Sequence, residues 1–355
     1  MHSIFSKVSV VKKYRYKLIL FIACFWTLID IIVLLTLNSL PGDNILYAVI
    51  LREVIVFLMS LVMAYLLIFT LRKLFRNYSL LVTLLGKSLI LVAAAFLMNL
   101  LLFSVNYISI LGLPANNVFH LYYGQEFYFD VLLKKIGYWL ILFVITQLII
   151  EINEKYSPGV FMDILLGKYT LPKVENRIVM FIDLKDSTPI AEKLGNQLNF
   201  KFIREFIYQV SNALIEYEGR IYQYVGDEIV VSWLFSKENC KRCMKALIEA
   251  RKNLQKNGEE FRRIYDMTPE FRVGIHVGDV MVGEIGVIKK DLAMSGDTMN
   301  TTARIRSACS ELNQKFIVSK DFLDKMNLEE WQSESLGMVE LKGKAKEIEL
   351  FSLKI

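Results

Sequence analysis

Cysteine is scarce in this sequence, and neither an internal repeat nor a low-complexity tract is present. The four cysteines are Cys24, Cys240, Cys243 and Cys309, of which only Cys240 and Cys243 have the spacing of a metal-binding pair. Because a metal site of that kind needs a second pair, we interpret both as ordinary thiols of one helix in a reducing compartment. The absence of repeats excludes a stacked-repeat architecture.

Long apolar runs are frequent in the first half of the 355 residues, and 54% of all residues are hydrophobic. Four runs stand out: Leu18–Leu37, Ile45–Leu71, Leu89–Leu113 and Ile136–Ile150. A bilayer core about 30 Å thick needs roughly 20 helical residues, which the fourth run reaches only with Val131–Leu133 or Ile152. We expect four transmembrane helices. Asp30 and Asn99 lie inside them and indicate either a functional pocket or interhelical hydrogen bonds.

Lysine and arginine are absent from residues 38–44 and 114–130, which connect these runs. They gather before the first run and between the second and third, so the positive-inside rule places both chain ends in the cytoplasm. The first run is longer than the apolar core of a signal peptide, and no small-residue cleavage site follows it. We expect a multi-pass protein of the bacterial inner (plasma) membrane, in contact with lipid. The net charge of +6 then reflects membrane topology, and no nucleic-acid partner is expected.

The composition changes at Glu151, where charges become frequent and apolar runs short. We expect a membrane anchor over residues 1–152, a linker over 153–176 and a cytoplasmic domain over 177–355. In the cytoplasmic domain, periodicity predicts helices at Ile190–Tyr217, Cys240–Tyr265 and Thr298–Ser310. It predicts strands at Arg177–Leu184, Arg220–Val225, Glu228–Phe235, Phe271–Val277, Val280–Ile285, Lys315–Ser319, Ser333–Lys342 and Glu347–Leu353. Two pairs of these strands are predicted hairpins, one joined at Gly226-Asp227 and the other at Gly278-Asp279. Strands paired in hairpins and covered by helices indicate an α+β sandwich.

Two carboxylates stand at the ends of predicted strands. Asp183 ends the strand in "RIVMFIDLKDST", and Asp227 follows Gly226 in the tight turn of "YQYVGDEIVV". Taken singly, they indicate only a helix cap and a turn former. Side by side on one sheet they would repel each other unless a cation lay between them, and Mg²⁺ prefers such oxygen ligands while leaving positions for phosphate. The pair therefore indicates a divalent-metal site.

A third stretch, "SGDTMNTTARIRS", carries Asn300 and Arg304. Their spacing of four residues places both side chains on one face of a helix. That face is either a solvated polar surface or an amide and a guanidinium directed at one ligand, and Arg suits a crowded phosphate. The spacing alone gives the two interpretations about equal weight.

Residues 177–353 resemble the catalytic domain of the class III nucleotidyl cyclases, in particular the bacterial membrane-bound ones. The resemblance rests on five motifs in the family's order: "FIDLKDST", "YQYVGDEIV", "VGIHVG", "GDTMNTTARI" and "ELKGKAKEIELFSL". It implies a ferredoxin-like α+β core of the order βααββαβ, below an α-helical membrane domain. It also implies a head-to-tail homodimer with two composite sites at the interface.

The resemblance assigns roles around the first two motifs. Asp183 and Asp227, with the carbonyl of Leu184, would bind two Mg²⁺ or Mn²⁺ per site. A metal lowers the pKa of the ribose 3′-hydroxyl and neutralises the leaving pyrophosphate. Thr188 and the backbone amides of Lys185–Ser187 would cradle phosphate where the next helix begins.

The other subunit would complete each site. By the family's pattern Asn300 would orient the ribose, Arg304 would stabilise the phosphorane-like transition state, and Lys342 would hold the terminal phosphates. Phosphoryl transfer depends on such positioning and charge stabilisation. His276 is interpreted as a structural strand histidine, because the metals already activate the nucleophile.

The purine contacts depart from the family's usual pattern. Adenylate cyclases usually carry Lys four residues before the second metal Asp and Asp three residues before the Gly of the Asn/Arg motif. Gln223 and Ala293 occupy these positions. The amide of Gln223 can donate or accept, whereas Ala293 offers the base no polar group. We therefore expect ATP to be preferred, with weak rejection of GTP.

These observations predict a membrane-bound cyclase that converts ATP to 3′,5′-cyclic AMP and pyrophosphate. A guanylate or dual-purine cyclase is one alternative, and a catalytically weak nucleotide-binding receptor is another. The retained Asp183, Asp227, Asn300 and Arg304 argue against the receptor. A diguanylate cyclase is disfavoured because the chain has no Gly-Gly-acidic hairpin signature.

Overall fold

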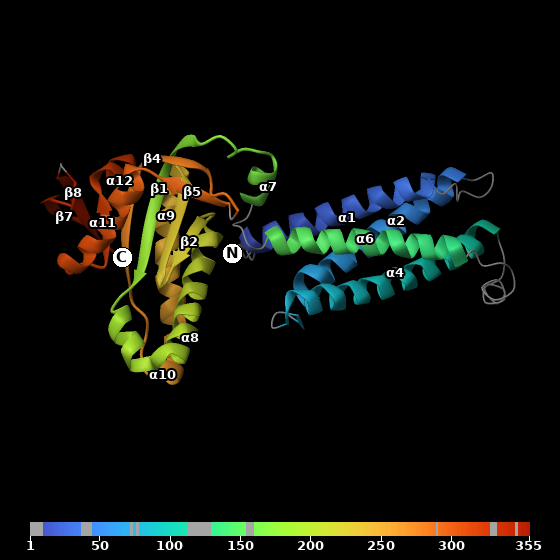
Figure 1. The fold of residues 1–355 in the computed structure, drawn as a ribbon, viewed down its shortest axis with the longest axis horizontal. Helices are drawn as coiled ribbons and strands as arrows, with labels where there is room; N and C mark the ends of the chain where they lie inside the picture. Colours follow the sequence, from blue (N-terminus) through green and yellow to red (C-terminus); the bar gives the residue numbers. More distant parts are fainter. Residues whose placement is uncertain are drawn as a thin grey trace, which may run out of the picture. The chain divides into compact units, whose positions relative to one another are not determined.

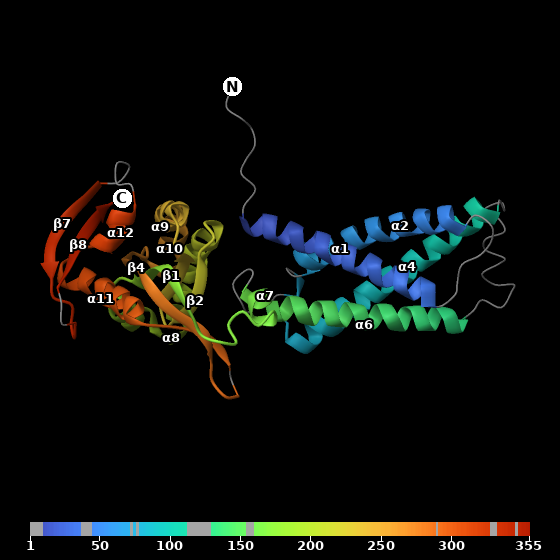
Figure 2. The ribbon, with the colours of Figure 1, turned by 90° about the horizontal axis from the view of Figure 1, so that it is seen from above.

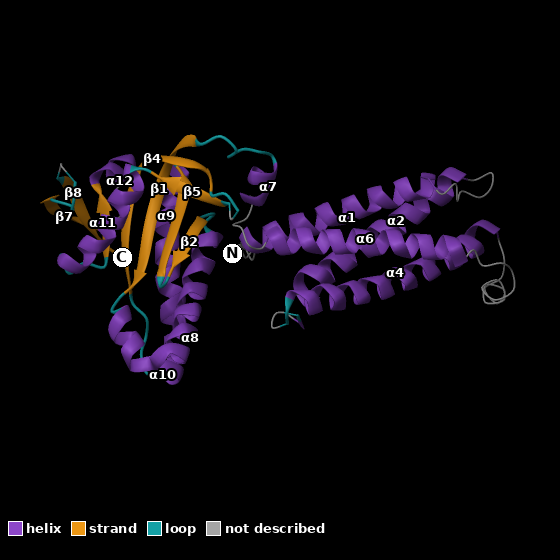
Figure 3. Cartoon of the chain, in the orientation of Figure 1, coloured by secondary structure: helices purple, strands orange, loops and turns teal. Residues whose placement is uncertain are grey.

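The structure is a computed structural model that describes residues 10–36, 45–71, 74–75, 78–111, 129–153, 160–288, 290–326, 332–344 and 347–355. The chain forms two compact units, of which one is Lys12–Lys155 and the other contains Tyr156–Ile355. The described part of the first unit is helical (Figure 1). Every described strand belongs to the second unit (Figure 3).

The first unit consists of long apolar helices: α1 (Val10–Thr36), α2 (Ile45–Tyr65) continued by the π-helix η1 (Leu66–Leu71), α4 (Leu80–Leu111) and α6 (Phe129–Asn153). Four segments are long and apolar enough to cross a bilayer, with mean hydropathies from 1.8 to 2.8. The four predicted membrane helices agree with this, and α6 exceeds the fourth apolar run at both ends. Most of residues 38–44 and 114–130, on which the expected orientation rests, lie outside the described residues.

Aromatic packing joins α1 to α6. Trp26 is fully buried, and its ring lies 4.9 Å from that of Phe143 between centroids. Its Nε1 donates a hydrogen bond of 3.0 Å to Oγ1 of Thr146. Lipid tails are as apolar as leucine, so close packing and hydrogen bonds of this kind stabilise helix pairs in a membrane.

The buried Asp30 has a partner on the neighbouring helix. Its carboxylate lies 2.5 Å from Nη1 of Arg52 on α2, and Arg52 also contacts Glu53. An ion pair between two helices supports the interpretation of Asp30 as an interhelical contact. The side chain of Asn99 lies outside the described residues.

The second unit begins with the short α7 (Val160–Leu165) and continues as an eight-stranded sheet with helices. The strands are β1 (Lys173–Leu184), β2 (Arg220–Val225), β3 (Glu228–Leu234), β4 (Phe271–Ile285), β5 (Asp291–Ser295), β6 (Phe316–Ser319), β7 (Gln332–Val339) and β8 (Ile348–Lys354). The helices are α8 (Ser187–Glu216), α9 (Lys237–Lys256), α10 (Gly258–Tyr265), α11 (Asp297–Glu311) and α12 (Lys320–Lys325). The strand order is β2-β3-β1-β4-β6-β8-β7, and β5 pairs with β4.

The central strand β1 is covered on both faces, which explains its unbroken apolar run. Ile178, Met180 and Ile182 belong to the core under α8 and α9. Val179 and Phe181 point to the opposite face and share a core with Met299 of α11. Asp183 continues this alternation, so it emerges on the face that carries α11.

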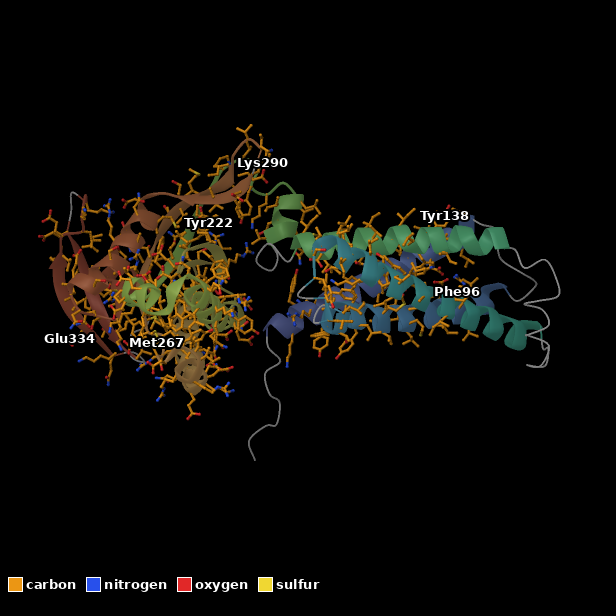
Figure 4. All side chains as sticks on the ribbon, turned by 60° about the horizontal axis from the view of Figure 1, so that its bottom comes forward. Phe96, Tyr138, Tyr222, Met267, Lys290 and Glu334 are labelled. Carbon is orange, nitrogen blue, oxygen red and sulfur yellow. The ribbon has the colours of Figure 1, made fainter. Side chains whose placement is uncertain are left out.

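One predicted hairpin is wrong. Residues Phe271–Val277 and Val280–Ile285 form the single strand β4, which runs straight through Gly278 and Asp279. Gly278 serves close packing instead of a turn, because a Cβ there would lie 2.5 Å from Oγ1 of Thr298 on α11. The end of β4 pairs with β5, a strand that the sequence analysis did not predict. Together they form a ribbon extending beyond the rest of the sheet, with Lys290 near its tip (Figures 2 and 4).

Two smaller differences concern element boundaries. β1 begins at Lys173, inside the expected linker, because its first residues pair with the end of β4. The predicted helix Cys240–Tyr265 is two helices, α9 and α10, which meet at Asn257. Cys240 and Cys243 are free thiols buried on α9, and burial raises the pKa of each, in keeping with ordinary helical cysteines.

The backbone of α11 lies close to β4 at Gly274. A Cβ on Gly274 would lie 2.4 Å from the backbone nitrogen of Arg306, a contact that only a shift of the helix can relieve. We expect Gly274→Ala to lower the free energy of unfolding of the second unit by about 1–3 kcal/mol, as overpacking does. Denaturant unfolding of the purified full chain measures it.

Gly258→Ala at the start of α10 is the matched control. The nearest atom to its Cβ would be 3.6 Å away, an ordinary contact. This variant should be as stable as the wild type or slightly more stable. Equal stability of both variants would contradict the proposed packing constraint.

Candidate active site

Asp183 and Asp227 lie at the same end of the sheet. Asp183 is the penultimate residue of β1, and Asp227 occupies the turn between β2 and β3, where Gly226 adopts a positive φ of 63°. β3 pairs with β1 up to the Ile182–Ile229 register position, so the hairpin turn lies beside the end of β1. The sheet therefore brings together the two carboxylates that the sequence analysis paired.

The two carboxylates interact strongly. Burial raises the pKa of Asp183; the Arg306 charge lowers this pKa, and the negative charge of Asp227 raises it. Oδ2 of Asp227 is buried and has no hydrogen-bond partner. Two adjacent anions, one with an unsatisfied buried oxygen, are poised to receive a cation.

This donor set fits a small divalent cation that retains open positions. Among the described residues, no group of three or more His, Cys, Asp or Glu side chains is arranged to hold a metal ion. Asp183, Asp227 and the carbonyl of Leu184 are oxygen donors of the kind Mg²⁺ and Mn²⁺ prefer. Water and substrate phosphates would supply the remaining ligands, as is usual for Mg²⁺.

Two further charged residues belong to this site and were missed by the sequence analysis. Nη2 of Arg306 lies 2.7 Å from Oε2 of Glu228, and its Nη1 lies 3.4 Å from Oδ2 of Asp183. Burial raises the pKa of Glu228, Arg306 lowers it, and Asp183 raises it again. Glu228 stands in "YQYVGDEIV" and Arg306 at the end of "SGDTMNTTARIRS", but only the fold shows that a helix and a hairpin meet here.

The segment after β1 departs in part from the phosphate cradle expected there. The amide of Lys185 donates a 2.8 Å hydrogen bond to the carbonyl of Glu270, so it is not free for phosphate. Asp186 has a φ of 59° and places the start of α8 at Ser187. Thr188 is exposed in the first turn of that helix, where an anion is favoured.

Arg304 and Arg306 point in different directions, because two residues of an α-helix span about 200°. A Cβ on Gly343 would lie 3.4 Å from Nη2 of Arg304, so Arg304 lies against the turn Leu341–Lys344. Lys342 is exposed in this turn, and Asn300 is exposed one turn before Arg304 on α11. The chain thus brings Arg304 close to the segment that carries Lys342.

The same turn is tied to the start of α11. Lys344 donates a 2.5 Å hydrogen bond to Asp297, the first residue of that helix. The C-terminal motif indicates Lys342, whereas the contact of Lys344 with Asp297 becomes visible only in the fold. The bond fixes the C-terminal turn beside the Asn300 and Arg304 face of α11.

His276 is a structural residue in this fold. It is buried on β4, and its Nδ1 lies 2.8 Å from Oγ of Ser319, the N-cap of α12. Burial lowers its pKa. Its hydrogen bond holds β4 and α12 together, in agreement with the interpretation as a strand histidine.

The two expected purine-contact positions lie on different strands. Gln223 is exposed on β2, and Val230 is its register partner on β3. Ala293 is half-buried on β5 opposite Gly283. Its neighbour Met294 is buried and accepts a hydrogen bond from Ser232 through its sulfur.

The comparison with known families concerns the second unit. The family described as "Adenylate and Guanylate cyclase catalytic domain" matches residues 170–354. "Adenylate cyclase 2" of Rhizobium meliloti (strain 1021) is 30% identical over 210 residues, which are 58% of this chain and 57% of that protein. "Adenylate cyclase" of Anabaena cylindrica is 26% identical over 183 residues, 50% of this chain and 36% of that protein. The chain thus spans at most about half the length of these curated relatives.

Solved structures show the same fold. A bacterial light-regulated adenylyl cyclase aligns with a TM-score of 0.53 and 18% identity, covering 61% of this chain and 64% of that one. At this identity the likeness concerns the fold, and the expected class III cyclase fold of the second unit is confirmed.

Proposed function

The chain belongs to the adenylate and guanylate cyclase catalytic domain family, and on this premise we propose that it is a membrane-bound adenylate cyclase. It converts ATP to 3′,5′-cyclic AMP and pyrophosphate. The observation that carries the proposal is the pair of facing carboxylates, Asp183 and Asp227, with a buried and unsatisfied Asp227 oxygen. Similarity to adenylate cyclases of two bacteria supports the choice of reaction.

The residues of this site serve substrate binding and charge stabilisation. Asp183, Asp227 and the Leu184 carbonyl hold two divalent cations, which when bound lower the pKa of the ribose 3′-hydroxyl and neutralise phosphate charge. Thr188 binds phosphate at the start of α8. These groups orient the triphosphate for in-line attack, which is the main demand of phosphoryl transfer.

A second set of residues completes the site from a partner copy of the chain. Asn300 orients the ribose, Arg304 stabilises charge in the transition state, and Lys342 holds the terminal phosphates. The contact between Arg304 and the turn Leu341–Lys344 supports a common role for the last two. The carboxylates of the same chain are engaged by Arg306 instead, which supports a head-to-tail homodimer with shared sites.

The division of the chain follows from this proposal. Residues 1–152 anchor it in the bacterial inner membrane with both ends in the cytoplasm, and residues 177–355 carry out catalysis. Residues 153–176 transmit changes from the anchor. An ion pair of 2.9 Å between Asp163 of α7 and Arg220 at the start of β2 supports this role, because β2 leads directly to Asp227.

The reaction itself is tested with the purified full chain, Mn²⁺ and either ATP or GTP. We expect cyclic AMP and pyrophosphate from ATP, identified by mass spectrometry. Asp227→Asn should abolish turnover and leave the unfolding midpoint unchanged, because it removes a cation ligand and little volume. Asp324→Asn on the exposed surface of α12 is the control. Substantial activity of Asp227→Asn with Mn²⁺ would refute the metal assignment.

The shared site is tested by mixing two inactive variants. If Asp183 acts across the interface from Arg304, Asp183→Ala and Arg304→Ala are each inactive alone. Their heterodimer contains one intact site, so random pairing should restore about a quarter of wild-type activity. Co-purification through two different affinity tags measures heterodimer formation. Heterodimers without activity would show that both residues act within one chain.

Purine selectivity is tested at Gln223 and Ala293. Ala293 offers no polar group to the base. The site therefore has few polar groups that would lose their hydrogen-bond partner when GTP replaces ATP, so it rejects GTP only weakly. We expect wild type to prefer ATP and to convert GTP measurably. Gln223→Lys combined with Ala293→Asp should raise the ATP-to-GTP ratio of kcat/KM by at least about tenfold. Complete exclusion of GTP by the wild type, or a preference for GTP, would contradict this account of the pocket.

A further inference from the structure

A third carboxylate lies next to the pair Asp183 and Asp227. Glu228 directly follows Asp227, and its side chain is only 14% exposed. Arg306 lies within ion-pair distance of both Glu228 and Asp183, so the third acid shares a counterion with the pair. No role in the proposed reaction accounts for this third acid.

Arg306 engages this acid more closely than the other two. Its guanidinium lies 2.7 Å from Glu228 and 3.4 Å from Asp183. Its Nε is buried and has no hydrogen-bond partner, and the same is true of Oε2 of Glu228. The contact with Glu228 is therefore an ion pair, and the hydrogen bond from the guanidinium goes to Asp183. The close approach of α11 at Gly274 places Arg306 over the ends of β1 and β3.

Arg306 links Glu228 to one of the cation ligands: it is ion-paired with Glu228, and its Nη1 donates a hydrogen bond of 3.4 Å to Oδ2 of Asp183. Among the described residues, no three acids are arranged as one metal-binding group, although three acids interact here. A second arginine of this end of the sheet, Arg272, is ion-paired with Asp186 at 3.8 Å, and none of the variants considered below alters either residue.

We propose that Arg306 and Glu228 are a positioning pair that sets the donor set and the net charge of the cation site. Arg306 holds Glu228 away from the metal, which leaves two carboxylates as ligands and open positions for the triphosphate. This inference rests on the metal assignment of the proposed function. It adds two residues that neither contact substrate nor bind the cation.

The two single substitutions change the net charge of the cation site in opposite directions, so they should change its affinity for a divalent cation in opposite directions. Three carboxylates and one guanidinium carry a net charge of −2 in the wild type. Arg306→Gln leaves −3 and frees Glu228 to act as a ligand, so a divalent cation binds more tightly. Glu228→Gln leaves −1 and leaves Asp183 as the charged partner of Arg306, so the cation binds more weakly. The double variant returns to −2 with no third carboxylate.

Mn²⁺ binding to the full chain in detergent, without nucleotide, is the decisive measurement. Electron paramagnetic resonance counts free Mn²⁺ during a titration. We expect the Kd to fall about tenfold in Arg306→Gln and to rise about tenfold in Glu228→Gln, in the range known for groups that hold metal ligands in place. The double variant should lie within about twofold of the wild type.

Two further variants control for charge and for structure. Arg306→Lys keeps the positive charge and should bind Mn²⁺ within about threefold of the wild type, and it serves if Arg306→Gln does not fold. Glu260→Gln and Arg263→Gln alter an exposed pair on α10, 3.9 Å apart, and should leave the Kd unchanged. Unfolding midpoints establish that each variant is folded.

The outcomes separate this inference from the proposed function. Opposite shifts in the two single variants, cancelled in the double variant, support the positioning pair. Wild-type binding with equal Kd values in all variants, or shifts of the same sign, overturns the pair and leaves the metal site standing. Absence of Mn²⁺ binding in the wild type and in every variant overturns the metal assignment itself.

Discussion

Concentrated negative charge at the end of β1 is the constraint on which the rest of the second unit depends. Asp183, Asp227 and Glu228 are brought together by the pairing of β3 with β1 and by the tight turn after β2. Carboxylates this close are stable only with compensating positive charge. Arg306 supplies part of it within the chain, and the buried, unsatisfied oxygen of Asp227 is left for a cation.

The position of α11 links this charge to the remaining catalytic groups. Gly274 and Gly278 let the helix lie against β4, since a side chain at either position would collide with it. Because the two arginines project from different sides of the helix, Arg306 contacts the carboxylate of Glu228 and Arg304 contacts the turn Leu341–Lys344. One helix thereby serves two places, as the proposed composite sites of a homodimer require.

The first unit is stabilised by different interactions from those of the second unit. Its helices gain little from burial against one another in lipid, so polar contacts and aromatic packing have greater weight. The Asp30–Arg52 ion pair and the hydrogen bond from Trp26 to Thr146 are contacts of this type. They give the unit specific helix pairings.

Local patterns in the sequence determined the membrane helices, the two carboxylates and most strands, because length, periodicity and turn residues act over a few neighbouring positions. They failed at Gly278 and Asp279, where a turn signal lies within the straight strand β4. Gly278 is required because a larger side chain there would collide with Thr298 on α11. Thr298 is distant in the sequence, so no local pattern reveals this contact. The same holds for Glu228 and Arg306: their types are visible in the sequence, but they are 78 positions apart (306 − 228). Only the packing of α11 on the sheet makes them partners, because ion pairing depends on distance in space and not along the chain.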